Sequence, residues 1–133
     1  MRLRGVLLGV VLAGIAASLY TIFATVPRSS RPATVPNCGV QQTRPANLTI
    51  ACGDGNDYLE SLHWSVWSGS VARGTGIEKV NDCDPYCAAG KFHNYAAAIT
   101  LDRVESHHFT RLRLHYSGAR PPNTPQDVSR TLR

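Results

Sequence analysis

The residues best suited to chemistry lie in one stretch, CDPYCAAGKFHNY, which runs from Cys83 to Tyr95. Its two cysteines could supply half of a zinc site, act as a redox pair or close a disulfide. A structural zinc site commonly needs a second closely spaced pair, but Cys38 and Cys52 have 13 residues between them. A thioredoxin-type redox motif has two residues between its cysteines, and this stretch has three. We therefore favour a local disulfide across a turn that contains proline.

The four cysteines of the chain allow three disulfide pairings. We predict Cys38–Cys52 and Cys83–Cys87, because two strands joined by a turn near TRPAN would bring the first two cysteines into register. The crossed pairings stay open as alternatives. An even number of cysteines in a short chain behind an export signal is typical of an oxidising compartment. Neither a metal nor a cofactor is predicted.

A histidine near carboxylates is the second candidate for chemistry. His93 with Asp82 or Asp84 could activate a hydroxyl group, and Tyr95 lies two residues further on. The chain has no HExxH motif and no Gly-x-Ser-x-Gly motif, so the usual partners of such a histidine are missing. We therefore assign no catalytic residue. A hydrolase or modifying enzyme that uses His93, Tyr95 and nearby carboxylates is kept as an alternative.

Aromatic side chains favour a binding surface instead. A face made of Trp67, Tyr86, His93 and Tyr95 could contact a carbohydrate or a peptide, because aromatic rings offer apolar area together with a polar group. Trp64 and Trp67 are three residues apart, so on a regular strand they point to opposite faces. The competing interpretation is that these rings fill a small core.

The stretch GDGND, residues 53–57, has two interpretations. Asp54 and Asn56 fit the alternating ligands of a calcium loop, but Tyr58 breaks the series and no glycine stands at its sixth position. Glycine, asparagine and aspartate also favour tight turns, so we predict a turn between two strands. Asn47, in NLT, is a formal glycosylation sequon for a host with that machinery.

The segments that would position these residues alternate with a period of two. Four runs show the alternation: NLTIAC, YLESLHWSVW, AAAITLDRV and FTRLRLHY. Alternation with β-branched and aromatic residues is typical of half-buried antiparallel strands. A further run, VARGTGIEKV, contains glycines and is expected to be bulged or closely approached by another backbone. We predict an all-β fold of five to six strands, either a small antiparallel sandwich or a partly open barrel.

Residues 5–26 form a run without charge that follows two arginines. A helix of this length covers about 33 Å, enough to cross a hydrocarbon core of about 30 Å. The run is either an uncleaved N-terminal membrane helix, which we favour because its cleavage site is poor, or the apolar part of a signal peptide. We expect a single-pass cell-membrane protein with its C-terminal domain outside, or a secreted protein if the leader is cleaved.

Composition divides the chain into four parts. They are a signal anchor or signal peptide at 1–26, a proline-rich linker at 27–37, a disulfide-stapled β domain at 38–117 and a disordered polar tail at 118–133. The β domain has seven basic and eight acidic side chains, so the formal charge of +5 arises outside it. A nucleic-acid binder needs basic groups gathered on its folded face. We therefore predict no nucleic-acid partner, and the sequence assigns no oligomeric state.

Taken together, the motifs resemble a group of small exported proteins common in actinobacteria. The pattern is a strand ending in Cys-Gly-Asp-Gly-Asn, then Leu-x-x-Leu-x-Trp-x-x-Trp, an Ala-x-Gly-x-Gly strand, Asn-Asp-Cys-x-Pro-x-Cys-Ala-x-Gly and a Phe-x-x-Tyr strand. The match spans Cys38 to about Leu101. The resemblance implies export, disulfides and a β fold, and it supplies no catalytic residue.

These observations lead to one functional prediction with two alternatives. We predict a non-catalytic binding or interaction module of the cell envelope, held at the membrane through residues 5–26, whose envelope or extracellular ligand the sequence does not name. The alternatives are the small secreted hydrolase described above and a purely structural surface protein.

Overall fold

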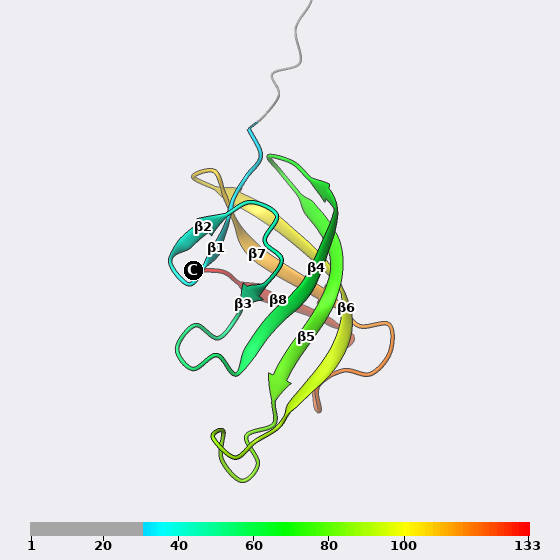
Figure 1. Cartoon of the computed structure of the whole chain (residues 1–133). Helices are drawn as coiled ribbons and strands as arrows, with labels where there is room; N and C mark the ends of the chain where they lie inside the picture. The colour runs from blue at the N-terminus through cyan, green and yellow to red at the C-terminus, as the bar shows by residue number, and fades with distance from the viewer. Residues whose placement is uncertain (1–30) are drawn as a thin grey trace, which may run out of the picture.

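The structure is a computed structural model that describes residues 31–133. The predicted membrane helix, residues 5–26, lies outside the described residues. Within the described part, no helix is long and apolar enough to cross a membrane. Eight strands follow one another along residues 31–133 (Figure 1): β1 (Val35–Asn37), β2 (Val40–Gln42), β3 (Leu48–Thr49), β4 (Asp57–Trp67), β5 (Ala72–Asn81), β6 (Phe92–Glu105), β7 (His108–His115) and β8 (Asp127–Thr131).

Strands β3 to β8 form one antiparallel sheet in which neighbours in the chain are also neighbours in the sheet. This sheet curls into a half-barrel, and β1 and β2 form a separate antiparallel pair beside it (Figure 1). A parallel bridge between Thr34 and His108 joins that pair to the start of β7. The predicted all-β antiparallel fold is confirmed, and the curled sheet corresponds to the partly open barrel.

The inner face of the curled sheet carries the hydrophobic core. Ala97, Ile99 and Leu101 of β6 are buried, as are Leu112 and Leu114 of β7, and the residues between them are more exposed. A period of two places every second side chain on the same face of a strand. The alternation predicted from the sequence is therefore confirmed for these two strands.

Strand β4 departs from regular alternation, and there the sequence prediction is wrong. Its pairing with β5 slips by one residue between Glu60 and His63 and again between Trp64 and Val66. Each slip is a β-bulge, which adds one residue to a strand and reverses the faces beyond it. Trp64 and Trp67 consequently pack against each other, with ring centroids 4.7 Å apart, and Val66 is exposed.

Strand β5 has glycines where β4 approaches it most closely. A Cβ atom at Gly74 would lie 2.3 Å from the backbone oxygen of His63, and a Cβ atom at Gly76 would lie 2.6 Å from the side chain of Leu62. Only a residue without a side chain fits such an approach. The predicted close approach to this strand is confirmed.

The described chain enters the half-barrel at the end where the β4–β5 and β6–β7 turns lie (Figure 1). Ala33 donates its backbone N–H to the carbonyl of Ser68 at 3.0 Å. In return, Trp67 Nε1 donates to the carbonyl of Ala33 at 2.8 Å. Residues 35–37, which the sequence analysis assigned to the linker, are strand β1. The folded part therefore begins a few residues earlier than predicted.

A disulfide ties the two-stranded sheet to the larger one. Cys38, in the turn between β1 and β2, bonds to Cys52 in the loop after β3, as predicted. The two cysteines are 14 positions apart in the sequence, and closing a loop of that size stabilises the folded state by about 3 kcal/mol on the chain-entropy account.

The last strand corrects the prediction of a disordered tail. Asp127–Thr131 pairs with β7 along its whole length. Only residues 118–126, before the strand, form a loop. The prediction failed because the central inward position of this strand is Arg130 rather than an apolar residue, so the run shows no hydrophobic alternation. The partners of Arg130 lie on distant strands.

Arg130 reaches across the open side of the half-barrel. Its guanidinium group donates to a carboxylate oxygen of Asp57, at the start of β4. It also donates to Oε1 of Glu78, on β5, at 3.0 Å. Tyr116, directly after β7, donates its hydroxyl to the other oxygen of Glu78, and both of these side chains are fully buried. We call Asp57, Glu78, Tyr116 and Arg130 the internal cluster.

We expect the internal cluster to hold the curled sheet closed. Arg130→Met keeps most of the side-chain length but leaves two carboxyl groups without their cation, and breaking a buried pair in this way costs about 3 kcal/mol. Arg113→Ala is the matched control, because Arg113 is half-exposed and its partner Asp102 keeps Arg111. An exposed pair is worth about 1 kcal/mol or less. Urea unfolding measures the loss of unfolding free energy in each variant. Equal losses in the two variants would contradict the role assigned to Arg130.

Candidate functional site

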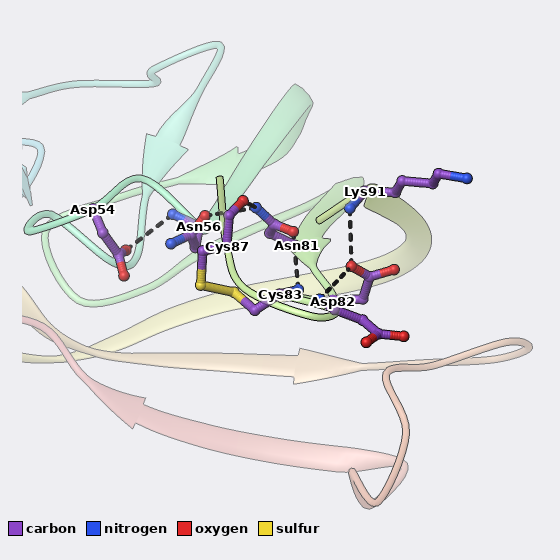
Figure 2. Close-up of a disulfide and its surroundings, with 8 residues drawn as sticks. Asp54, Asn56, Asn81, Asp82, Cys83, Cys87 and Lys91 are labelled. Atoms are coloured by element: carbon purple, nitrogen blue, oxygen red, sulfur yellow. Dashed lines mark hydrogen bonds between the residues drawn. A yellow bond between two sulfur atoms is a disulfide. The ribbon is translucent and has the colours of Figure 1, made fainter. Parts of the chain in front are cut away.

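The two cysteines of CDPYC close a loop between β5 and β6, which Figure 2 shows in detail. Cys83 bonds to Cys87, the pairing predicted from the sequence. The separation is four residues, so the bond restrains this loop and no distant segment. Because no cysteine of the described chain is free, no thiolate remains here to ligate zinc. We call residues 82–91 the disulfide loop.

Asn81, the last residue of β5, fastens the disulfide loop to the sheet (Figure 2). Its amide nitrogen donates to the carbonyl of Cys87 at 2.8 Å and to the side chain of Asn56 at 2.9 Å. Its amide oxygen accepts from the backbone N–H of Cys83 at 3.0 Å. Asn81 is only 9% exposed, so these bonds have little competition from water. One side chain thereby connects the disulfide loop to the GDGND turn.

The GDGND stretch forms the turn between β3 and β4, as predicted. The backbone N–H of Asn56 donates to Oδ1 of Asp54 at 3.0 Å, the arrangement of an Asx turn. Gly55 has a φ of +69°, a conformation that glycine adopts without strain. Within residues 31–133, no group of three or more His, Cys, Asp or Glu side chains is placed to hold a metal ion.

A hollow of about 580 Å³ opens beside the disulfide loop, and we call it the mouth. The end of β5 and the start of β6, which line it, lie at the end of the half-barrel opposite to the entry of the chain (Figure 1). Its volume is in the range of about 300–1,000 Å³ typical of small-molecule sites. Its lining comes from the end of β5, from β6, from the loop before β8 and from β8. The residues are Val80, Asn81, Asp82, His93, Tyr95, Pro121, Pro122, Thr124 and Arg130.

The register of the sheet explains why these side chains converge. Val80 of β5 is paired with His93 of β6, and Glu78 is paired with Tyr95 two residues along. All four occupy inward-facing positions, because directly opposed residues share a face of the sheet. His93 and Tyr95 therefore lie in the continuation of the core beyond Ala97, where apolar side chains give way to polar ones.

Asp82 and His93 form the polar wall of the mouth. Oδ2 of Asp82 and Nε2 of His93 are 2.8 Å apart. Oδ1 of Asp82 accepts from the backbone N–H groups of Lys91 at 2.9 Å and Asp84 at 3.1 Å. The bond to His93 and these two backbone donors lower the pKa of Asp82 to about 2. The carboxylate is therefore ionised at neutral pH and fixed in place.

The internal cluster lies behind this wall, and Arg130 is its one member that lines the mouth. Burial raises the pKa of Glu78 above its usual range, although the hydrogen bond from Tyr116 acts in the opposite direction. Burial and Glu78 together raise the pKa of Tyr116. Burial tends to lower the pKa of Arg130, but Asp57 and Glu78 outweigh that effect and raise it. The floor of the mouth is thus a guanidinium group already engaged by carboxyl groups.

The structure brings together only part of the predicted binding face. His93 and Tyr95 both line the mouth. Tyr86 is exposed on the disulfide loop, with 63% of its surface accessible, but does not line the mouth. The prediction that Trp67 belongs to the binding face is wrong, because Trp67 is buried against Trp64 and Phe109, near the opposite end of the half-barrel. The bulges of β4 turned it into the core.

The second wall of the mouth is the loop at residues 118–126, which was not predicted from the sequence. Pro121 is buried, and its carbonyl accepts from the backbone N–H of Thr124 at 3.2 Å. Nε of Arg120 donates to the carbonyl of Thr124 at 2.8 Å. The prolines that were interpreted as disorder instead fix φ and pre-form this wall. The high proline content of this segment was the one signal of a fixed wall in the sequence, and it was wrongly interpreted as a sign of disorder.

No protein-family model matches the chain, and comparisons with curated proteins and with solved structures find no match either. The resemblance to small exported proteins stays a prediction.

We expect Asn81 to be the residue that orders the disulfide loop. Asn81→Ala removes three part-buried hydrogen bonds and leaves the N–H of Cys83 and the carbonyl of Cys87 without their side-chain partner, which costs about 2 kcal/mol. Amide hydrogen exchange should accelerate at Cys83, whose N–H loses its acceptor, and urea unfolding should report the loss of stability. The matched control is Asn94→Ala, because Asn94 is exposed on β6. If both variants loosen the loop equally, Asn81 is not its fastener.

The Asp82–His93 contact predicts a defined acid response. The pKa of Asp82 in the folded state, about 2, is below its ordinary value of 3.8, so this carboxylate stabilises the folded state above about pH 4. That contribution is lost as the pH falls from about 4 to about 2. In His93→Ala, the NMR titration midpoint of the Asp82 carboxyl should rise toward 3.8.

The control for this titration is His115→Ala, since His115 pairs with Asp127 on the outer face. That variant should leave the midpoint of Asp82 unchanged. A midpoint that stays near 2 in His93→Ala would assign the shift to the backbone donors of Lys91 and Asp84 instead.

Proposed function

We propose that this chain is an exported or membrane-anchored protein whose half-barrel is a non-catalytic binding module of the cell envelope, with the mouth as its binding site. The observation that carries the proposal is the hollow lined by Asp82, His93, Tyr95 and Arg130, because it brings a tyrosine ring together with a carboxylate that three hydrogen bonds hold in place. Convergent polar groups in a partly apolar hollow are typical of ligand sites.

The placement of the mouth supports an envelope role. The described chain enters the half-barrel at one end, and the end of β5 and the start of β6, which line the mouth, lie at the other end (Figure 1). Strand β5, with 10 residues, connects the two ends, a span of about 30 Å at about 3.3 Å per residue. An anchor at residues 5–26 would therefore present the mouth away from the membrane. Two disulfides are compatible with an oxidising exterior.

The Asp82–His93 pair also favours a second candidate, a small hydrolase. A carboxylate that orients an imidazole is part of many general-base sites. Nucleophilic catalysis additionally needs a hydroxyl or thiol within hydrogen-bond reach of that imidazole. Within residues 31–133, no Ser, Thr or Cys side chain bonds to His93, and the hydroxyl of Thr124 points to the carbonyl of Pro122 at 3.4 Å. Binding is therefore the better supported function.

Co-sedimentation of the full chain with the insoluble envelope fraction of its host tests the proposal. We expect binding that weakens about tenfold in His93→Ala, since losing a polar contact to a fixed site costs about 1.4 kcal/mol. His63→Ala is the control, because His63 is exposed on β4 outside the mouth. Equal binding by both variants would exclude the mouth as the site. Release of soluble fragments by the wild type but not by His93→Ala would favour the hydrolase.

A further inference from the structure

We infer that the mouth takes an uncharged, hydroxyl-rich ligand, a segment of a neutral saccharide chain. This inference rests on the proposed function and adds the chemical class of the ligand. Three properties of the mouth carry it: the state of its charges, the nature of its apolar surface and the rigidity of its walls.

The charges of the mouth are already paired within the protein. Arg130, which forms the floor, donates to Asp57 and Glu78. Asp82, the ionised wall residue, accepts from His93 and from two backbone groups. Anion sites instead use cationic groups that are free to form bidentate contacts. The mouth therefore offers no free cation to an acidic ligand.

Other cations near the mouth do not change this balance. The side chain of Lys91 points away from Asp82 in Figure 2, although its backbone N–H contacts that carboxylate. Nε of Arg120 is engaged by the carbonyl of Thr124, and Arg120 does not line the hollow. An anionic ligand would also meet the ionised carboxylate of Asp82. Charge thus selects against acidic sugars and phosphate groups.

The apolar part of the lining consists of the flat ring of Tyr95, which carries a hydroxyl group at its edge, and the aliphatic side chains of Val80, Pro121 and Pro122. The Tyr95 ring and the rings of Pro121 and Pro122 line the hollow between the polar groups. An aromatic ring with a hydroxyl offers a broad apolar face beside a hydrogen-bonding group, which matches a sugar ring with C–H faces and hydroxyl edges. A purely apolar ligand would leave the paired groups of Asp82, His93 and Arg130 desolvated without compensation.

Both walls are fixed before any ligand binds. The disulfide loop is held by Cys83–Cys87 and Asn81. The opposite wall is held by its prolines and by the bonds around Thr124. Pre-formed walls reduce the ordering cost of binding, which matters for a ligand that is itself strongly hydrated.

The experiment uses the full chain in detergent micelles on a printed array of neutral and acidic bacterial glycans, with a proline-rich decapeptide as a competing probe. We expect binding to neutral glycans that changes less than twofold between 50 and 500 mM salt, because uncharged contacts are not screened. Tyr95→Ala should weaken it about tenfold through loss of ring stacking. Phe92→Ala, an exposed aromatic of the same strand, should leave it unchanged.

Two measurements keep the test decisive if Tyr95→Ala loses its fold, since Tyr95 also packs against the core. Pro122→Ala alters an exposed wall residue and should weaken binding by a smaller factor. The salt dependence needs no variant at all.

Preference for acidic glycans with steep salt dependence would overturn the neutral saccharide as the ligand but leave the mouth as a binding site. So would capture of the peptide, in a manner sensitive to Tyr95→Ala, without neutral glycan binding. Binding that neither Tyr95→Ala nor Pro122→Ala weakens, or no binding by any probe, would overturn both the class and the proposed function.

Discussion

The half-barrel depends on one polar contact across its open side, the reach of Arg130 to Asp57 and Glu78. Backbone hydrogen bonds join each strand to its neighbours, but β3 and β8 are the two edges of the sheet and no ladder connects them. An open curled sheet exposes both edges. Here the guanidinium group of the last strand takes the place of a ladder by contacting side chains of β4 and β5, which lie on the opposite side of the curl.

Closing the sheet with charged side chains costs desolvation free energy, and this cost affects the arrangement of the mouth. Removing carboxyl groups and a guanidinium from water is expensive, and only good geometry with further hydrogen bonds offsets it. Tyr116 supplies one such bond to Glu78. Arg130 keeps about a third of its side chain accessible, at 31%, because the mouth opens above it. The hollow and the closure therefore belong to one arrangement, and a ligand in the mouth would contact the group that holds the sheet together.

The sequence predicted the parts of the fold that obey a local period and missed those set by distant contacts. Strands β6 and β7 run without a bulge, so Ile99 and Leu114 fell on the predicted face. On β4 two bulges shift the face, because the glycines of β5 let the strands approach there, and Trp67 turned inward. No local pattern in β4 marks a bulge. Strand β8 was missed because Arg130, its central inward residue, is charged and interrupts the hydrophobic alternation. The two partners of Arg130 are 52 and 73 residues away in the sequence.

The candidate site was predictable to the extent that its residues are close in sequence. The contact between Asp82 and His93 crosses only the disulfide loop, and alternation on β6 places Tyr95 on the same face as His93. The prolines of the opposite wall come from a segment whose polar, proline-rich composition is typical of disordered chain. What separates that segment from a flexible tail is the strand that follows it, since pairing of β8 with β7 holds the loop at both ends. A proline-rich stretch between two paired strands is better interpreted as a stiff connection, and in this fold that stiffness forms half of the binding surface.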